Sequence, residues 1–286
     1  MSETKFGPAG NDQLFYDEGN TSSLQAPKWI ANLGLNLFEY SFGSGINISD
    51  ANARLIGEEA KKYGIEMSVH APYYINFASV EPELVEKSFM YVTKSLEKLK
   101  IFGGKNCVVH MGSTGRQRRE EAFEGIMRNL DILLEKVEEK GLSDLYICPE
   151  TMGKNVQIGT VDEIVEFCKK GKNLVPTFDF GHINCIGQGS LKTKQDYEAI
   201  FEKALNNLDE EKVKNCHIHF SKIQYGPKGE LKHLTLEDNL YGPPFEPLAE
   251  AIIELRLTPS IICECKGKMA IDAVTMQKIY NSLKNN

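Results

Sequence analysis

Asp179 and His182 stand three residues apart in a segment, residues 176–184, that reads PTFDFGHIN. Asp179 closes an apolar run that begins at Leu174, and His182 directly follows a glycine. A carboxylate and an imidazole at a strand-to-loop transition can point into one pocket and bind a divalent metal ion. The same residues also occur in ordinary turns, so this pair alone does not identify a site.

The pattern recurs along the chain, because six apolar runs end in residues that commonly bind metals. The runs read EMSVH, CVVH, YICPE, VPTFDF, NCHIHF and SIICE, and they end at His70, His110, Glu150, Asp179, His217 with His219, and Glu264. All six histidines of the chain, including His182 and His233, lie at such an end or in the segment that follows one. Carboxylates and imidazoles without a thiolate are typical of zinc or manganese in hydrolytic sites, where two or three ions can share a carboxylate.

The elements that carry these residues alternate between short apolar runs and longer amphipathic ones. The runs predict strands at 5–8, 35–40, 66–70, 106–110, 145–150, 174–179, 215–220 and 260–264. Helices are predicted at 27–33, 50–63, 81–102, 118–140, 160–170, 194–208, 247–255 and 270–283, with start signals at 47–50, at Thr160 with Glu163, and at Thr193.

Eight such units in 286 residues favour an α/β fold, a single (β/α)8 TIM barrel that forms one domain over residues 1–286. All strands of such a barrel open their carboxyl ends onto one face, so the metal site is expected there. An open doubly wound sheet is the alternative, but no GxGxxG follows a strand.

Composition narrows the class of protein. A hydrophobic content of 41% and a charged content of 26% suit a soluble domain with a buried core. The chain has no run of about 18 apolar residues and no secretion signal at its start, so we expect a cytoplasmic monomer without a membrane partner. The seven cysteines are an odd number and include no CxxC pair, which predicts buried thiols rather than disulfides. The net charge of −7 does not decide whether the partner is a nucleic acid, since bound cations would make one face locally positive.

The strand-end segments resemble the endonuclease IV family of apurinic/apyrimidinic DNA repair enzymes. The resemblance extends from about Glu66 to the end of the chain, and its motifs are HAPYYIN (70–76), VVHMGS (108–113), PETMG (149–153), TFDFGHIN (177–184), HIHFSK (217–222) and CECKG (263–267). It implies an eight-stranded barrel with a trinuclear zinc site, which hydrolyses the DNA backbone at abasic sites through a metal-activated hydroxide.

The resemblance also implies which residues hold each ion. The first ion would have three ligands: His70, His110 and Glu150. The second would share Glu150 and have three more: Asp179, His217 and Glu264. The third would have two: His182 and His233. Glu150 and Glu264 would be the catalytic carboxylates.

Contacts to DNA follow from the same resemblance. Tyr73 and Tyr74 would press into the minor groove beside a flipped abasic site, although packing at the barrel rim accounts for them equally well. Lys222 is a separate inference from its position in the loop after the seventh strand, on the face where the site would open. There it would contact a phosphate, and a solvated charged rim is the alternative.

Three departures from the family pattern concern the third ion and the DNA. Leu231 stands where the family has an Asp, with Glu230 beside it, and His219 stands where the family has an Asn. The loop after the second strand, FGSGINI, lacks the arginine that the family directs at DNA. Alternation along an extended segment would place Glu230 opposite Leu231, so we expect a weakened third site.

These observations leave three hypotheses. The first is a zinc-dependent hydrolase of the deoxyribonuclease IV type, with two or three Zn²⁺ ions (Mn²⁺ is the alternative) and DNA with abasic sites as substrate. The second is a sugar isomerase or epimerase of the xylose-isomerase type, in which one ion would have four ligands: Glu150, Asp179, His217 and Glu264. The third is a metal-binding barrel without catalysis. His70 and His110 separate the first two hypotheses, because a one-metal sugar enzyme does not require them.

Overall fold

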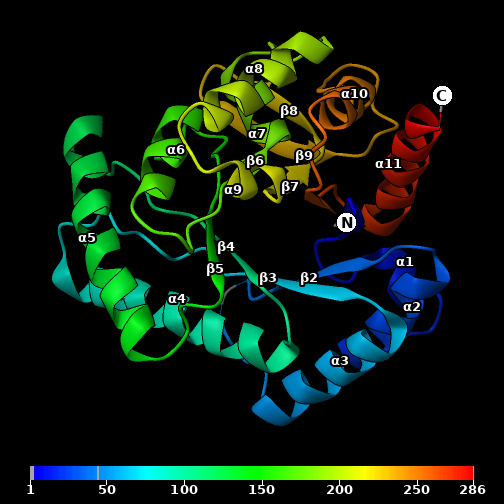
Figure 1. The fold of residues 1–286 in the computed structure, drawn as a ribbon, viewed down its shortest axis with the longest axis horizontal. Coiled ribbons are helices and arrows are strands. Elements are labelled where there is room, and N and C mark those ends of the chain that lie inside the picture. The colour runs from blue at the N-terminus through cyan, green and yellow to red at the C-terminus, as the bar shows by residue number, and fades with distance from the viewer. Residues whose placement is uncertain (1–2, 44, 286) are drawn as a thin grey trace.

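A closed barrel of parallel strands occupies the centre of the molecule, and helices surround it (Figure 1). The computed structural model describes residues 3–43 and 45–285. Within that part of the chain the barrel strands are β1 (Lys5–Pro8), β2 (Leu37–Ser41), β3 (Glu66–His70), β4 (Asn106–Val109), β5 (Tyr146–Pro149), β6 (Thr177–Asp179), β7 (His217–Phe220) and β10 (Ser260–Cys263).

The strands form two parallel ladders that meet at two seams. One ladder has the order β1-β10-β7-β6 and the other β2-β3-β4-β5. Parallel bridges from Ala9 to Glu39 and from Glu150 to Thr177 join the ladders, so the order around the barrel follows the chain. Gly7 allows β1 to approach β2 at one seam, since a Cβ there would lie 1.8 Å from the carbonyl oxygen of Leu37. The predicted (β/α)8 barrel is confirmed.

The helices lie outside the strands and are amphipathic. The long ones are α3 (Asp50–Tyr63), α4 (Pro82–Phe102), α5 (Arg119–Glu139), α6 (Val161–Lys169), α8 (Lys194–Leu205), α10 (Glu246–Glu254) and α11 (Met269–Lys284). The short ones are α1 (Gln13–Asp17), η1 (Ser23–Gln25), α2 (Ala26–Asn32), α7 (Phe180–Ile186) and α9 (Glu210–Lys214). All three predicted start signals are confirmed, since Ser49, Thr160 and Thr193 are the N-cap residues of α3, α6 and α8.

Three features near the site differ from the sequence-based expectation. The segment after β6, expected to be a loop, is the helix α7, with Asp179 as its N-cap and His182 in its first turn. β6 begins only at Thr177, because Pro176 has no N–H for the ladder. The chain after β7 forms an antiparallel hairpin of β8 (Lys222–Gly226) and β9 (Gly229–Leu234), which the apolar periodicity did not predict.

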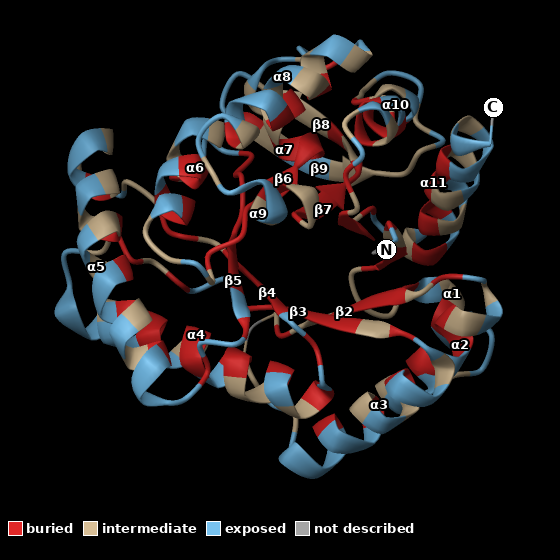
Figure 2. Ribbon diagram, in the orientation of Figure 1, coloured by how far each residue is buried: buried red, intermediate tan, exposed pale blue. Residues whose placement is uncertain are grey.

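Burial follows the layers, with buried residues on the strands and on the inner faces of the helices (Figure 2). All seven cysteines are free and buried, as predicted. Among the residues described, no helix is both long and apolar enough to cross a membrane. The barrel interior also contains fully buried ionisable side chains, including Glu39, Glu150, Asp179, His217 and His219.

Candidate metal centre

The carboxyl ends of six neighbouring strands bring metal-ligand side chains together. β3 and β6 end at His70 and Asp179, β7 contains His219, and His110, Glu150 and Glu264 directly follow β4, β5 and β10. These side chains form two groups whose ligand atoms lie within 4.8 Å of one another. The prediction that strand ends converge on one face is therefore correct.

The first group consists of His70, His110 and Glu150. Oε2 of Glu150 lies 3.2 Å from Nε2 of His70 and 2.9 Å from Nε2 of His110. The two imidazole rings are nearly perpendicular, with centroids 4.8 Å apart. Both imidazoles thus direct the same nitrogen at one carboxylate oxygen, as the ligands of a shared ion would.

The second group consists of Glu150, Asp179, His219 and Glu264. Nδ1 of His219 lies 3.0 Å from Oε1 of Glu150 and 3.3 Å from Oε2 of Glu264. Glu150 therefore contacts the first group through one oxygen and the second through the other. This is the geometry of a carboxylate that bridges two ions.

His217 is not part of this group, which corrects the expectation for the seventh strand. Strand register decides the difference, because Asp179 pairs with His219 and Thr177 pairs with His217. His217 lies one layer deeper, where its Nε2 is 2.9 Å from Oε2 of Glu39. The resemblance assigned His217 to the second group, whereas His219 lies there and His217 belongs to a separate, deeper group with Glu39 and His219. Both ring nitrogens of His217 have partners inside the barrel.

A third group forms at the hairpin from His182, Glu230 and His233. Oε2 of Glu230 lies 3.6 Å from Nε2 of His182, and Oε1 lies 3.4 Å from Nε2 of His233. The expected absence of an acid from this group is therefore wrong. The cause is a register shift, because Gln224 pairs with Lys232 while Tyr225 pairs with Glu230, which leaves Leu231 as an extra residue. Such a bulge brings Glu230 and His233 onto one face, contrary to simple alternation.

Glycines let the hairpin approach the barrel. A Cβ at Gly153 would lie 2.5 Å from Cδ2 of His182 and 3.1 Å from Cβ of Glu230. A Cβ at Gly229 would lie 2.2 Å from the carbonyl oxygen of Gly153. Larger residues at these positions would push the third group apart.

In three histidines, the ring nitrogen Nδ1 forms a hydrogen bond to another residue of the protein. Nδ1 of His70 lies 2.7 Å from the carbonyl oxygen of Ala71, and Nδ1 of His182 lies 2.9 Å from that of Thr151. Nδ1 of His233 lies 2.9 Å from the hydroxyl oxygen of Ser221. A carbonyl oxygen only accepts, so Nδ1 of His70 and of His182 carries a proton. In the neutral form of each ring, the Nε2 lone pair then points toward the carboxylates.

Charge pairing sets the titration of these groups. Burial alone would raise the pKa of Glu150, but His219 and His110 hold it well below its usual range. For His70, burial opposes protonation, yet the hydrogen bond and charge of Glu150 raise the pKa to about 9. At the third group, the hydrogen bond from His233 is the main reason that the pKa of Glu230 falls to about 2. Burial raises the pKa of Asp179. Without ions, the cluster is thus an array of charges that neutralise one another.

A cavity of about 660 Å³ opens over the three groups. Its lining includes four of the histidines, one carboxylate of the second group (Glu264) and one of the third (Glu230). Tyr73 and three lysines also line it: Lys154, Lys232 and Lys266. The ring of Tyr73 lies 5.5 Å from that of His70 and 5.8 Å from that of His110, and 58% of the residue remains exposed. Tyr74 is 64% exposed and does not line this cavity.

Lys222 differs from the sequence-based expectation. Its ammonium group donates to the carbonyl oxygens of Leu236 and Asp238, so it holds the segment after the hairpin instead of facing the cavity. The lysines of the cavity wall are better placed to meet a phosphate.

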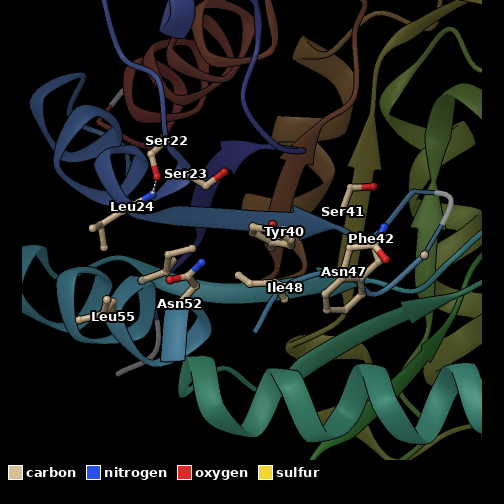
Figure 3. Close-up of a pocket in the computed structure, with 12 residues that line it drawn as sticks. Ser22, Ser23, Leu24, Tyr40, Ser41, Phe42, Asn47, Ile48, Asn52 and Leu55 are labelled. Carbon is tan, nitrogen blue, oxygen red and sulfur yellow. Dashed lines mark hydrogen bonds between the residues drawn. The ribbon is translucent and has the colours of Figure 1, made fainter. Parts of the chain in front are cut away.

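A separate cavity of about 420 Å³ lies between the end of β2, the Ser22–Leu24 segment and the start of α3 (Figure 3). Tyr40, Ser41, Phe42, Asn47 and Asn52 are among its lining residues. The described lining contains no carboxylate, imidazole or ammonium group, so this cavity does not resemble a metal or phosphate site.

Sequence reasoning missed Glu39 and the place of Glu230 in the third group. Glu39 is fully buried and contacts both histidines of β7. The signal was a glutamate inside an apolar strand, LFEYS, where a charge must be paired. Glu230 could not be found from periodicity, because its direction depends on the bulge.

Together, these features define an α/β barrel with several adjacent groups of carboxylates and imidazoles that could hold divalent ions. Residues 27–279 match the family described as xylose isomerase-like TIM barrel. The chain belongs to this family.

Two relatives agree with this assignment. An uncharacterized protein from Methanocaldococcus jannaschii is 32% identical over 280 residues, which are 97% of each chain. A probable endonuclease 4 from Staphylococcus carnosus is 30% identical over 186 residues, which are 63% of this chain and 60% of the relative. The similarity to endonuclease 4 proteins confirms the resemblance seen in the sequence, over part of their length.

Solved structures share the fold with more than one activity. A D-tagatose 3-epimerase-like protein superposes with a TM-score of 0.68 and 21% identity, over 90% of this chain and 92% of that one. Endonuclease IV from Thermus thermophilus gives a TM-score of 0.66 and 19% identity, over the full length of both chains. At these identities the similarity shows the fold alone.

Proposed function

We propose that the protein is a metal-dependent phosphodiesterase that cleaves DNA at abasic sites and uses two or three divalent ions. The observation that carries the proposal is the joining of three ligand groups in one cluster. Glu150 links the first two groups, and Nδ1 of His182 lies 3.2 Å from Oδ2 of Asp179, which links the second and third. A sugar enzyme with one ion would need only one of them.

The residues present fit such ions. The donors are imidazoles and carboxylates without a thiolate, a set that favours Zn²⁺ or Mn²⁺. Oδ2 of Asp179 is buried and accepts no hydrogen bond, so a cation in the second group would satisfy it. When bound, divalent ions at such a site activate water and neutralise negative charge that develops on phosphate oxygens.

The side chains around the groups would position a phosphodiester. The ammonium groups of Lys154, Lys232 and Lys266 border the cavity and would attract the DNA backbone. They provide positive charge that the loop after β2 lacks. The exposed ring of Tyr73, held beside His70 and His110, could stack on an opened base step. The cavity volume is in the range of small-molecule sites and would accommodate a flipped abasic nucleotide.

Cleavage of a duplex that carries one abasic site tests the proposal. The wild-type protein, loaded with Zn²⁺ or Mn²⁺, should cut that duplex and leave an intact duplex of the same sequence whole. Removal of the ions with a chelator should abolish cutting, and return of the metal should restore it. A metal-loaded protein that leaves both duplexes uncut would overturn the proposal.

A sugar epimerase or isomerase is the second candidate, because the second group alone contains a Glu-Asp-His-Glu set. Glu150 and Glu264 could then move protons at carbon while Asp179 and His219 complete the site. This reading predicts one ion per chain and exchange of a sugar C–H proton with deuterated solvent. The phosphodiesterase proposal predicts neither.

A further inference from the structure

A buried carboxylate below the metal groups has no role in the function proposed above. Glu39 projects from β2 into the barrel and is fully buried. An ionised carboxylate in such a place is costly unless it is paired and hydrogen-bonded. Its partners therefore indicate what it does.

One oxygen of Glu39 is fixed from two sides. Oε2 lies 2.9 Å from Nε2 of His217 and accepts a hydrogen bond of 2.9 Å from the hydroxyl of Ser68. The other nitrogen of His217, Nδ1, lies 3.2 Å from Nδ2 of Asn106. An amide nitrogen only donates, so Nδ1 of His217 accepts, and the proton on Nε2 is donated to Glu39.

The other oxygen of Glu39 faces a residue of the second metal group. Oε1 lies 3.0 Å from Nε2 of His219. Both atoms are buried, and neither has a hydrogen-bond partner among the described residues. Because a carboxylate oxygen only accepts, this contact places the proton of a neutral His219 on Nε2 and leaves the lone pair on Nδ1.

That lone pair points at the metal groups. Nδ1 of His219 lies 3.0 Å from Oε1 of Glu150 and 3.3 Å from Oε2 of Glu264, and both of these oxygens are acceptors as well. In the neutral form of His219 these three electron-rich atoms face one another, and either a proton on Nδ1 or a metal ion between them removes the repulsion. Glu39 thus acts on the side of the imidazole opposite to this cation position.

We propose that Glu39, braced by His217 and Asn106, is a positioning residue that fixes the tautomer of His219 for metal binding through Nδ1. The inference rests on the metal centre of the proposed function. A carboxylate behind a metal-binding imidazole sets the orientation of the ring and makes it a stronger ligand, and loss of such a partner typically lowers metal affinity about 10- to 100-fold.

Glu39→Gln tests the proposal, because the two imidazoles contact different oxygens of Glu39 and glutamine replaces one of these acceptors with a donating amide nitrogen. The Zn²⁺ affinities of metal-free wild type and variant are measured by competition with a chromophoric chelator. One ion should bind about 10- to 100-fold more weakly in the variant, with unchanged stoichiometry at saturating metal. At a pH above the raised pKa of His219, the ¹⁵N shifts of its ring should change from the Nε2–H tautomer in the metal-free wild type to a mixture or to Nδ1–H in Glu39→Gln.

Two further variants separate positioning from general stability. Ser68→Ala removes a donor to Glu39 but keeps both imidazole contacts, so its metal affinities should match those of the wild type. Glu39→Asp keeps the charge but shortens the side chain, and it should also weaken one ion. It provides the measurement if Glu39→Gln does not fold.

The outcomes are distinct. Folded Glu39 variants with wild-type affinities for every ion would overturn this inference and leave the metal centre intact. A stoichiometry lower by one, with the other affinities unchanged, would show that Glu39 is itself a ligand and would also overturn it. A wild-type protein that binds no ion would overturn both the inference and the proposed function.

Discussion

Oε2 of Glu230 lies 3.6 Å from Nε2 of His182, across the gap between the hairpin and the barrel. This contact gives the third group a carboxylate even though Leu231 stands at the position where an acid was expected. Leu231 is 64% exposed, whereas the side chain of Glu230 is only 18% exposed. The bulge in β9, and not a ligand at the aligned position, completes the group.

Glu230→Gln should therefore weaken the binding of one ion, at the third group, and leave the others unchanged. A neutral amide keeps the size of the side chain but loses the charge that pairs with both imidazoles. Metal titration should show one ion with at least about tenfold lower affinity, by analogy with other losses at metal sites. Leu231→Ala is the matched control at the neighbouring position and should leave all affinities unchanged. Equal titration curves for Glu230→Gln and the wild type would show that Glu230 holds no ion.

Glu150→Gln should be the most damaging conservative change, because its two oxygens contact two groups. We expect loss of at least one bound ion and a fall of about 100-fold or more in turnover, as when a charge-stabilising group is removed. Glu163→Gln is the control, since Glu163 is also a largely buried glutamate but pairs with Arg119 and caps α6. Near wild-type turnover for Glu150→Gln would exclude a bridging role.

The sequence predicted which strand-end side chains come together, but it predicted the geometry between strands less well. His70, His110, Glu150, Asp179 and Glu264 follow from apolar runs that stop, which is local information. The choice of His219 over His217 depends on the register of β7 against β6. That register is set by packing around the whole barrel, so no pattern within β7 contains it.

The third group shows the same limit. The direction of Glu230 depends on one extra residue in a hairpin whose strands carry no clear alternation. Glu39 was missed for another reason. The pattern of ligand-type residues lies at strand ends, whereas Glu39 lies in the middle of β2 and contacts the second group through His219.

The metal-free protein should lose stability as the pH rises from neutral to alkaline values. The pKa values of His70 and His233 rise from 6.5 to about 9. Burial opposes both rises; Glu150 raises the pKa of His70, and Glu230 raises that of His233. A histidine whose pKa is higher in the folded than in the unfolded state stabilises the fold fully at pH values below its unfolded-state pKa. This contribution is lost as the pH rises through the folded-state pKa of about 9. The pKa of Glu230 falls from 4.5 to about 2, so this carboxylate stabilises the folded protein at pH values above its unfolded-state pKa. That contribution is lost only in acid, as the pH falls through about 2.

Thermal denaturation of the chelator-treated protein at about pH 6 and about pH 9.5 measures this effect. The midpoint should be lower at the higher pH, and the difference should shrink in Glu230→Gln, where His233 loses its anionic partner. Metal affinity should change in the opposite direction and increase with pH, because ions compete with protons for the imidazoles. A metal-free protein that is more stable at about pH 9.5 would contradict the assigned charge pairs.

DNA binding should depend steeply on salt if the cavity lysines contact phosphates. Each neutralised phosphate contributes a slope of about −0.9 in a plot of log affinity against log salt. Replacement of Lys154, Lys232 or Lys266 by Gln should reduce the size of the slope by up to about 1. It should weaken binding to intact and abasic duplexes by the same factor. Lys284→Gln, at the end of α11 and outside this cavity, is the control. Slopes that are identical in all four variants would exclude the lysines as phosphate contacts.

Tyr73→Ala should reduce the preference for abasic over intact duplex more than Tyr74→Ala. The two tyrosines are adjacent and similarly exposed, but only Tyr73 lines the cavity and lies against the rings of His70 and His110. Loss of a stacked aromatic ring costs about 1 to 3 kcal/mol per base, and an intact duplex offers no opened step to stack on. Binding of each variant to both duplexes in a metal-loaded, non-cleaving background measures the difference. If Tyr74→Ala loses the preference and Tyr73→Ala keeps it, Tyr73 serves only to pack against the two histidines.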